Sequence, residues 1–198
     1  MATEIELKAH VKDSEALKRI LFEKTEYLGA FEKKDIYWYP AGDHSSRAWN
    51  LPPSGLRLRL EKRSYPNGTE ENATFATYKM KEVRDGIEIN NEREFEVRTS
   101  PSQGEPAFEE FLRRMGLKPG AAKRKRGWAF SLEGITAELV DVEGLGWFVE
   151  LEILADNSSE ETFAEGKKRL LKLLDELGVG REAIEDRFYT EMLRAAKP

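Results

Sequence analysis

Charged and apolar residues alternate in the first predicted strand, Glu4-Ile5-Glu6-Leu7-Lys8. Because successive side chains of a β-strand point to opposite faces, Glu4, Glu6 and Lys8 would share one face. The alternation recurs with both signs of charge in later predicted strands, at Arg57 and Arg59, Lys79 and Lys81, Glu94 and Glu96, and Glu150 and Glu152. If these faces turn inward, they enclose a wet cavity that suits a polyanion and its divalent cations.

The basic residues point to phosphate binding. Arg57 and Arg59 would present two guanidinium forks on one strand face, and such forks match phosphate oxygens. The run Lys123-Arg124-Lys125-Arg126 offers a basic residue on either face of a strand. For any one pair, a solvated strand face is the more common explanation. Edge strands also carry charges against aggregation, but few of so many charged strands can lie at an edge.

The acidic residues point to a hard cation. Glu4 with Glu6, and Glu150 with Glu152, could each offer carboxylate oxygens to such an ion. Asp141 has apolar neighbours on both sides in Leu139-Val140-Asp141-Val142, where a solvated face is a poor explanation. Buried like charges are costly unless a metal or a base offsets them. The alternative is a ligand-free interior in which acidic and basic strands neutralise one another.

Composition narrows the function classes. The 198 residues include 35% charged residues, no cysteine and two histidines, and the net charge is −5. This balance gives no global attraction to nucleic acid or to an anionic membrane. Thiolate chemistry is excluded and a histidine-built metal site is disfavoured, so a metal site would use carboxylates and favour Mg²⁺ or Mn²⁺. We see no signal peptide or apolar run of bilayer length, and expect a cytoplasmic protein.

The periodicity predicts about eight strands and three or four helices in a single domain over residues 1–198. The predicted strands cover residues 3–11, 35–39, 55–63, 74–83, 87–98, 123–131, 135–142 and 147–154, and the predicted helices cover 14–28, 106–115, 158–177 and 187–195. Hairpin signals such as Asp85-Gly86 make the strands mostly antiparallel. We therefore expect an α+β fold, in which amphipathic helices cover the apolar outer faces of an eight-stranded antiparallel barrel with a charged interior.

An ordered set of motifs resembles the CYTH superfamily, the triphosphate tunnel metalloenzymes, which include class IV adenylyl cyclases and thiamine triphosphatases. Glu4 to Lys8 is similar to the family's Glu-x-Glu-x-Lys signature. The later matches are Asp35-Ile36-Tyr37, the Arg-x-Arg strand at 56–59, Thr77-Tyr78-Lys79, the Glu-x-Glu strand at 93–97, Asp141-Val142 and the acidic strand at 146–152. The resemblance covers nearly the whole chain in the right order.

The resemblance implies an eight-stranded tunnel and roles for its residues. Lys8, Arg57, Arg59 and Lys79 would hold the triphosphate, with Lys81, Lys123, Lys125, Arg126 and Tyr37 as further substrate contacts. The metal would be Mg²⁺ or Mn²⁺, held by Glu4, Glu6, Asp141, Glu150 and Glu152, and Glu94 and Glu96 would be further tunnel acids. On the sixth strand, Lys123-x-Lys125 followed by Trp128 fits the family's spacing better than Arg124-x-Arg126.

The implied activity is metal-dependent chemistry on a small-molecule triphosphate: inorganic triphosphate, ATP or thiamine triphosphate. Hydrolysis is favoured because water needs no adenosine pocket, and we identify none in the sequence. The alternative is a class IV adenylyl cyclase that makes cyclic AMP and pyrophosphate from ATP, since Asp35-Ile36-Tyr37 and the predicted loop after it, residues 41–54, also resemble the cyclases. A non-catalytic polyphosphate- or nucleotide-binding module is a third option. The sequence leaves assembly open, including a homodimer.

Overall fold

The computed structural model describes residues 3–41, 55–98, 104–157 and 159–196, except for the side chains of 79, 81, 92 and 104–106. The predicted loop at 41–54 therefore lies almost wholly outside the described residues. The elements in chain order are β1 (Thr3–His10), α1 (Ser14–Lys24), β2 (Glu26–Pro40), β3 (Leu56–Ser64), β4 (Glu70–Arg84), β5 (Ile87–Glu96), α2 (Gly104–Arg114), β6 (Leu117–Leu132), β7 (Ile135–Val142), β8 (Gly146–Ala155), α3 (Glu160–Glu176), η1 (Arg181–Ala183) and α4 (Tyr189–Ala195).

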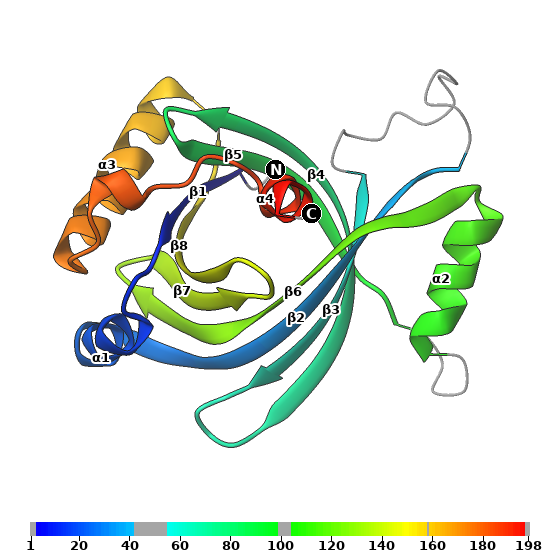
Figure 1. Cartoon of the computed structure of the whole chain (residues 1–198), viewed down its shortest axis with the longest axis horizontal. Helices are drawn as coiled ribbons and strands as arrows, with labels where there is room; N and C mark the ends of the chain where they lie inside the picture. Colours follow the sequence, from blue (N-terminus) through cyan, green and yellow to red (C-terminus); the bar gives the residue numbers. More distant parts are fainter. Residues whose placement is uncertain (1–2, 42–54, 99–103, 158, 197–198) are drawn as a thin grey trace.

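The predicted α+β class with antiparallel strands is confirmed. Neighbouring strands pair in the order β1-β5-β4-β3-β2-β6-β7-β8, and every pairing is antiparallel. Because β1 also pairs with β8 along its whole length, the order of pairing returns to the strand where it begins. Figure 1 shows the strands curving around an interior, with α4 seen end-on against it.

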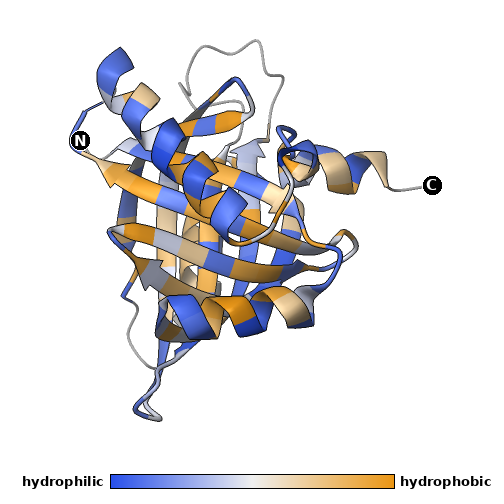
Figure 2. Ribbon diagram, turned by 90° about the vertical axis from the view of Figure 1, so that its left-hand side faces the viewer, coloured by the Kyte–Doolittle hydropathy of each residue, from blue (hydrophilic) through white to orange (hydrophobic). Residues whose placement is uncertain are grey.

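The apolar faces of the strands point outward, beneath helices. Ile5, Leu7 and Ala9 of β1 are buried in one cluster with Leu17 of α1 and Leu170 of α3. Figure 2 shows hydrophobic and hydrophilic residues alternating along the strands, as a period of two requires. α1 and α3 thereby bury the apolar alternate residues of β1, and Glu4 and Glu6 turn toward the interior.

The second helix covers a different part of the outer face. Leu112 of α2 is buried with Trp38 of β2, Leu58 of β3 and Leu117 of β6. Figure 1 shows α2 on the side of the molecule opposite α1 and α3. Among the described helices, none is both long enough and apolar enough to cross a membrane.

The first helix is shorter than predicted, and the strand after it is longer. The sequence predicts a helix to about Leu28 and a strand over residues 35–39, whereas α1 ends at Lys24 and β2 begins at Glu26. Thr25 is extended and its N–H caps the helix at the carbonyl of Leu21. Gly29 has a φ of +137°, at a register shift between β2 and β6, and a Cβ there would lie 2.5 Å from the Ser64 carbonyl oxygen. Only glycine fits this bend, and periodicity does not reveal it.

Candidate active site

A cavity of about 930 Å³ lies inside the ring of strands and is lined mainly by charged side chains. The inward residues come from alternate positions of the strands, as the sequence predicts. Among the described lining residues, nine are carboxylates and seven are cations. The carboxylates are Glu4, Glu6, Glu61, Glu88, Glu94, Glu138, Glu150, Glu152 and Glu191, and the cations are Lys33, Arg57, Arg59, Arg63, Lys123, Lys125 and Arg194.

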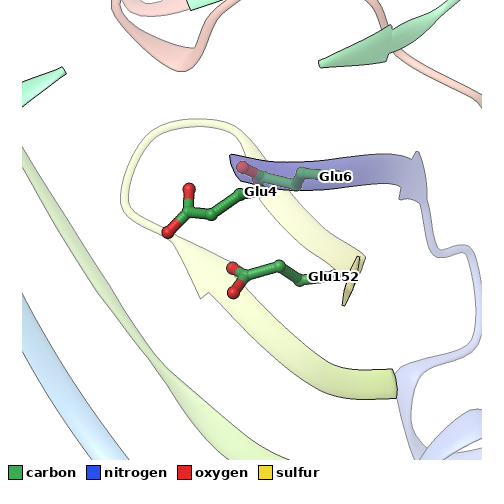
Figure 3. Close-up of side chains that lie close together, drawn as sticks. All are labelled: Glu4, Glu6 and Glu152. Atoms are coloured by element: carbon green, nitrogen blue, oxygen red, sulfur yellow. The ribbon is translucent and has the colours of Figure 1, made fainter. Parts of the chain in front are cut away.

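Three of the predicted metal ligands come together. One carboxylate oxygen from each of Glu4, Glu6 and Glu152 lies within 4.8 Å of the other two. Figure 3 shows the three carboxylates converging from β1 and β8. Strand register explains the arrangement, because Glu6 of β1 lies directly opposite Glu152 of β8. Oxygen donors held this close to one another match the chemistry of a hard divalent cation, so these residues fit Mg²⁺ or Mn²⁺.

Glu150 has a different environment from the other predicted metal ligands. Its Oε2 accepts a hydrogen bond from Lys125 Nζ at 2.6 Å, and both side chains are buried. Burial by itself would raise the pKa of Glu150, but the Lys125 ammonium outweighs it and holds this pKa well below its usual range. Glu150 is therefore a charged partner of Lys125 in this structure, outside the group of Glu4, Glu6 and Glu152.

Arg57 and Arg59 line the cavity on β3, as predicted. Arg57 Nη2 donates to Thr77 Oγ1 and to Glu94 Oε2, each at 3.0 Å. Arg59 forms a two-pronged ion pair with Asp35, which is fully buried. Burial would raise the pKa of Asp35, but Arg59 and Lys123 together hold that pKa well below its ordinary value.

Lys8 is not itself among the residues that line the cavity. Its side chain is almost fully buried and its Nζ pairs with Glu88 of β5, which itself lines the cavity. The Lys8 ammonium also lies 5.7 Å from the ring centroid of Tyr189. Lys8 therefore shares the inward face with Glu4 and Glu6, as predicted, but an acid already accompanies it.

On β6, the structure separates the two basic pairs. Lys123 and Lys125 are buried and line the cavity, in agreement with the pair favoured from the sequence. Arg126 points away, with 74% of its side chain exposed, and pairs with Asp141 of β7 at 3.2 Å. Arg126 and Asp141 are thus brought together with each other, but neither is among the cavity-lining residues.

The other predicted residues divide between cavity and surface. Tyr37 and Glu94 line the cavity. Glu96 lies on the same face of β5 near the strand end, where it is exposed and pairs with Arg98. Lys79 and Lys81 belong to β4, but their side chains lie outside the described residues.

Sequence reasoning missed an interior acid–base network. Lys33 of β2 is buried and donates to Glu138 of β7 at 2.5 Å, and Lys125 lies 3.7 Å from the same carboxylate. Burial would raise the pKa of Glu138, but Lys33 and Lys125 hold it below its ordinary value. The signal was present in the alternation Phe31-x-Lys33-x-Asp35, but the predicted strand began only at residue 35. Glu61 and Glu88 were missed as well, although each alternates with a recognised inward residue.

The C-terminal helix closes part of the interior. Tyr189 and Met192 of α4 are buried against inward residues including Phe31, Val140 and Phe148. The Tyr189 ring lies 5.0 Å from Lys123 Nζ. Burial, and then the neighbouring Glu150 carboxylate, raise the pKa of Tyr189 well above its ordinary value. The sequence predicts a helix over residues 187–195, but nothing local shows that its Tyr189 packs against the interior of the ring of strands.

The segment before α4 is tied to β1. The Glu185 amide donates to the Lys8 carbonyl oxygen at 2.9 Å, and Glu185 Oε2 lies 3.1 Å from His10 Nε2. Arg187 donates two hydrogen bonds to the same carboxylate, from Nε at 2.8 Å and from Nη2 at 2.6 Å. These bonds fix the point at which the chain turns toward the cavity, and so they position α4.

A ring of antiparallel strands with an inward carboxylate group and inward arginines and lysines agrees with the fold and motifs of the CYTH domain family. The family's model matches residues 2–189, and the chain belongs to this family. Among curated proteins it is similar to the "Putative adenylate cyclase MJ0240" of Methanocaldococcus jannaschii, with 26% identity over 96% of this chain and 97% of the relative.

Solved structures have the same fold. The PH1819 protein of Pyrococcus horikoshii OT3 is 28% identical, with a TM-score of 0.75 over 98% of this chain and 99% of that chain. A Hippeastrum protein, "Putative adenylyl cyclase HpAC1", described as having a dominant triphosphatase activity, has a TM-score of 0.63 at 20% identity. That comparison covers 100% of this chain and 97% of the Hippeastrum chain, and it shows the fold alone.

Proposed function

We propose that the protein is a metal-dependent hydrolase of a triphosphate-bearing substrate, with the ring of eight strands as the substrate tunnel. The observation that carries the proposal is the presence of inward arginines and lysines and a three-carboxylate group in one cavity. Carboxylates outnumber cations among the described lining residues, so a bare polyanion would meet a net negative wall. A divalent cation that arrives with the substrate offsets this excess of negative charge.

The basic side chains would hold the phosphates. Four of the cavity's cations each have an acid partner: Arg57, Arg59, Lys123 and Lys125. A phosphate group would either displace this acid from the cation or bind the cation beside it. Lys8, which pairs with Glu88, would add positive charge near the phosphates without lining the cavity. Lys79 and Lys81 remain candidates from the family resemblance. Arg126 and Asp141 are left out, because their ion pair lies away from the cavity.

The carboxylate group would hold the metal. Glu4, Glu6 and Glu152 are the proposed ligands of Mg²⁺ or Mn²⁺, which when bound supplies charge neutralisation and an activated oxygen for attack on phosphorus. The protein's own contribution is to orient the chain of phosphates and to stabilise charge on their oxygens through preorganised cations. Phosphoryl transfer needs such positioning more than it needs a protein nucleophile.

One experiment tests the proposal. The purified protein is incubated with inorganic triphosphate, ATP or thiamine triphosphate, with Mg²⁺, with Mn²⁺ or with EDTA, and products are identified by phosphorus NMR. We expect metal-dependent release of orthophosphate, fastest from inorganic triphosphate. Arg57→Ala should lower turnover strongly, whereas Arg114→Ala, an exposed arginine on α2, serves as the matched control. Orthophosphate release that is equal in EDTA, or no product from any substrate, would refute the hydrolase assignment.

The second candidate is a class IV adenylyl cyclase. The similarity to the archaeal relative named as an adenylate cyclase favours it, as do Tyr37 and Tyr39, aromatic residues of β2 that line the cavity. A cyclase must order the nucleoside as well as the phosphates, so that the ribose hydroxyl faces the α-phosphate. Cyclic AMP and pyrophosphate as the main products from ATP, with inorganic triphosphate intact, would establish this reaction. Binding without any product would instead identify a polyphosphate-binding module.

A further inference from the structure

Asn90 of β5 lies next to the carboxylate group and is fully buried. Its backbone is the register partner of Glu4, and its side-chain Nδ2 donates a hydrogen bond to Glu6 Oε2 at 3.1 Å. The side-chain amide therefore faces the group formed by Glu4, Glu6 and Glu152. The orientation of the amide follows from the partner, because an ionised carboxylate can only accept and the nitrogen must point toward it.

The other end of the same amide is unusual. Asn90 Oδ1 is buried and has no hydrogen-bond partner among the described residues. Leaving a buried acceptor unsatisfied costs about 1–3 kcal/mol, and most buried polar atoms in folded proteins have a partner. An amide oxygen is a neutral ligand that magnesium, manganese and calcium sites accept alongside carboxylates. An unpartnered amide oxygen beside three carboxylates is therefore chemically suited to a cation site.

We propose that Asn90 is part of the cation site: its nitrogen orients the Glu6 carboxylate, and its oxygen serves the bound cation directly or through water. The inference rests on the proposed function in that it takes Glu4, Glu6 and Glu152 as the other ligands. A neutral ligand at this position offers an oxygen without adding a fourth negative charge to three that already repel one another. With Asn90 included, the site contains a residue of β5 as well as residues of β1 and β8.

Substitution by leucine separates a role in the site from a structural one. Asn90→Leu keeps the approximate volume but removes the bond to Glu6 and the unpartnered oxygen. A structural asparagine replaced in this way would lower the stability of the metal-free protein and leave metal affinity unchanged. An asparagine of the cation site should show the reverse: metal affinity reduced and metal-free stability little changed, because the lost bond to Glu6 and the removal of an unsatisfied buried acceptor offset each other.

The test is titration calorimetry of the full chain with Mn²⁺ in the presence of a saturating, slowly turned-over triphosphate analogue, together with thermal unfolding of the metal-free protein. We expect Asn90→Leu to weaken Mn²⁺ binding about 10- to 100-fold, the usual effect of removing an outer partner of a metal ligand. Asn90→Asp, which restores an oxygen, should recover part of this loss. Asn91→Ala is the matched control, since the adjacent Asn91 bonds Thr3 instead.

Three outcomes would overturn the inference. The first is an Asn90→Leu protein that folds and binds Mn²⁺ within twofold of the wild type. The second is an Asn90→Asp protein that binds Mn²⁺ as weakly as Asn90→Leu, which would show that the oxygen has no role in binding the cation. The third is a wild-type protein that binds neither Mn²⁺ nor Mg²⁺, which would refute the proposed metal site itself. The first two outcomes leave the proposed function standing, so the two failures are distinguishable.

Discussion

Asp35 of β2 and Arg59 of β3 face each other across the strand register and form a two-pronged ion pair. Arg59 Nε lies 2.7 Å from Asp35 Oδ1, and Nη2 lies 3.0 Å from Oδ2. Asp35 is fully buried, and its other cation, Lys123, is 3.4 Å away. One of the two arginines expected to bind phosphate therefore also neutralises a buried acid, whereas Arg57 pairs with the partly exposed Glu94.

We predict that the two arginines differ in their effect on stability. Arg59→Ala leaves the Asp35 carboxylate buried beside Lys123 alone and should cost about 3–5 kcal/mol in the free energy of unfolding, as breaking a buried pair does. Arg57→Ala should cost about 1 kcal/mol. Urea unfolding measures both. Equal losses would contradict the assignment, and Asp35→Asn combined with Arg59→Ala should recover part of the larger loss.

Divalent cations should stabilise the folded protein through the carboxylate group. At a hundredfold excess of Mg²⁺ or Mn²⁺ over the dissociation constant, mass action adds about 2.7 kcal/mol. Glu152→Gln should raise the melting temperature of the metal-free protein, because it relieves repulsion with Glu4 and Glu6, and should reduce the shift that metal produces.

Glu150→Gln is the comparison variant for that prediction. It breaks the buried pair with Lys125, so it should lower the melting temperature of the metal-free protein instead. If Glu150→Gln stabilised the metal-free protein and Glu152→Gln destabilised it, the assignment of the metal ligands to Glu152 over Glu150 would be wrong.

Acid should weaken the attachment of the C-terminal segment. The hydrogen bonds from Arg187 lower the pKa of Glu185 from 4.5 to about 2. A carboxyl whose pKa is lower in the folded state contributes stability above its unfolded pKa and loses it as the pH falls through the folded pKa. Glu185 should thus stabilise the fold fully near pH 6 and lose this contribution between about pH 4.5 and pH 2.

The measurement is urea unfolding at pH 6, 4 and 3 for the wild type, Glu185→Gln and Glu182→Gln. Glu185→Gln should be less stable at pH 6 and should approach the wild type as the pH falls. Glu182 is exposed in η1 and provides the matched control. A constant gap between Glu185→Gln and the wild type across this range would count against the ion pair with Arg187.

Arg194 of α4 should contribute to substrate binding. It lines the cavity, and no ion pair joins it to another described residue, whereas Arg57, Arg59, Lys123 and Lys125 each have an acid partner. Arg194→Ala should raise KM for the triphosphate roughly tenfold, about 1.4 kcal/mol, with little change in melting temperature. Arg181→Ala, which removes an exposed arginine paired with Asp175, is the control. An unchanged KM would show that the substrate does not reach α4.

The alternation of charge within single strands allowed much of the site to be predicted from the sequence. Glu4 and Glu6, Arg57 and Arg59, and Glu150 and Glu152 were placed on common strand faces because a period of two is local and needs no knowledge of neighbouring strands. Lys123 was favoured over Arg124 only through the resemblance to the family's motif spacing. The antiparallel pairing followed from turn signals such as Asp85-Gly86. The sequence did not reveal Lys33, because the start of β2 depends on a glycine bend and on pairing with β6.

By itself, then, the sequence determined the class of fold, the charged character of the interior and the family. Only the tertiary structure decided which charges meet. Glu152 joins Glu4 and Glu6 while Glu150 binds Lys125, and Asp141 pairs with Arg126 outside the cavity. The physical reason is that such partners are set by register across strands and by the face each side chain takes. These depend on contacts between residues as far apart as Glu6 and Glu152, and no local pattern encodes them.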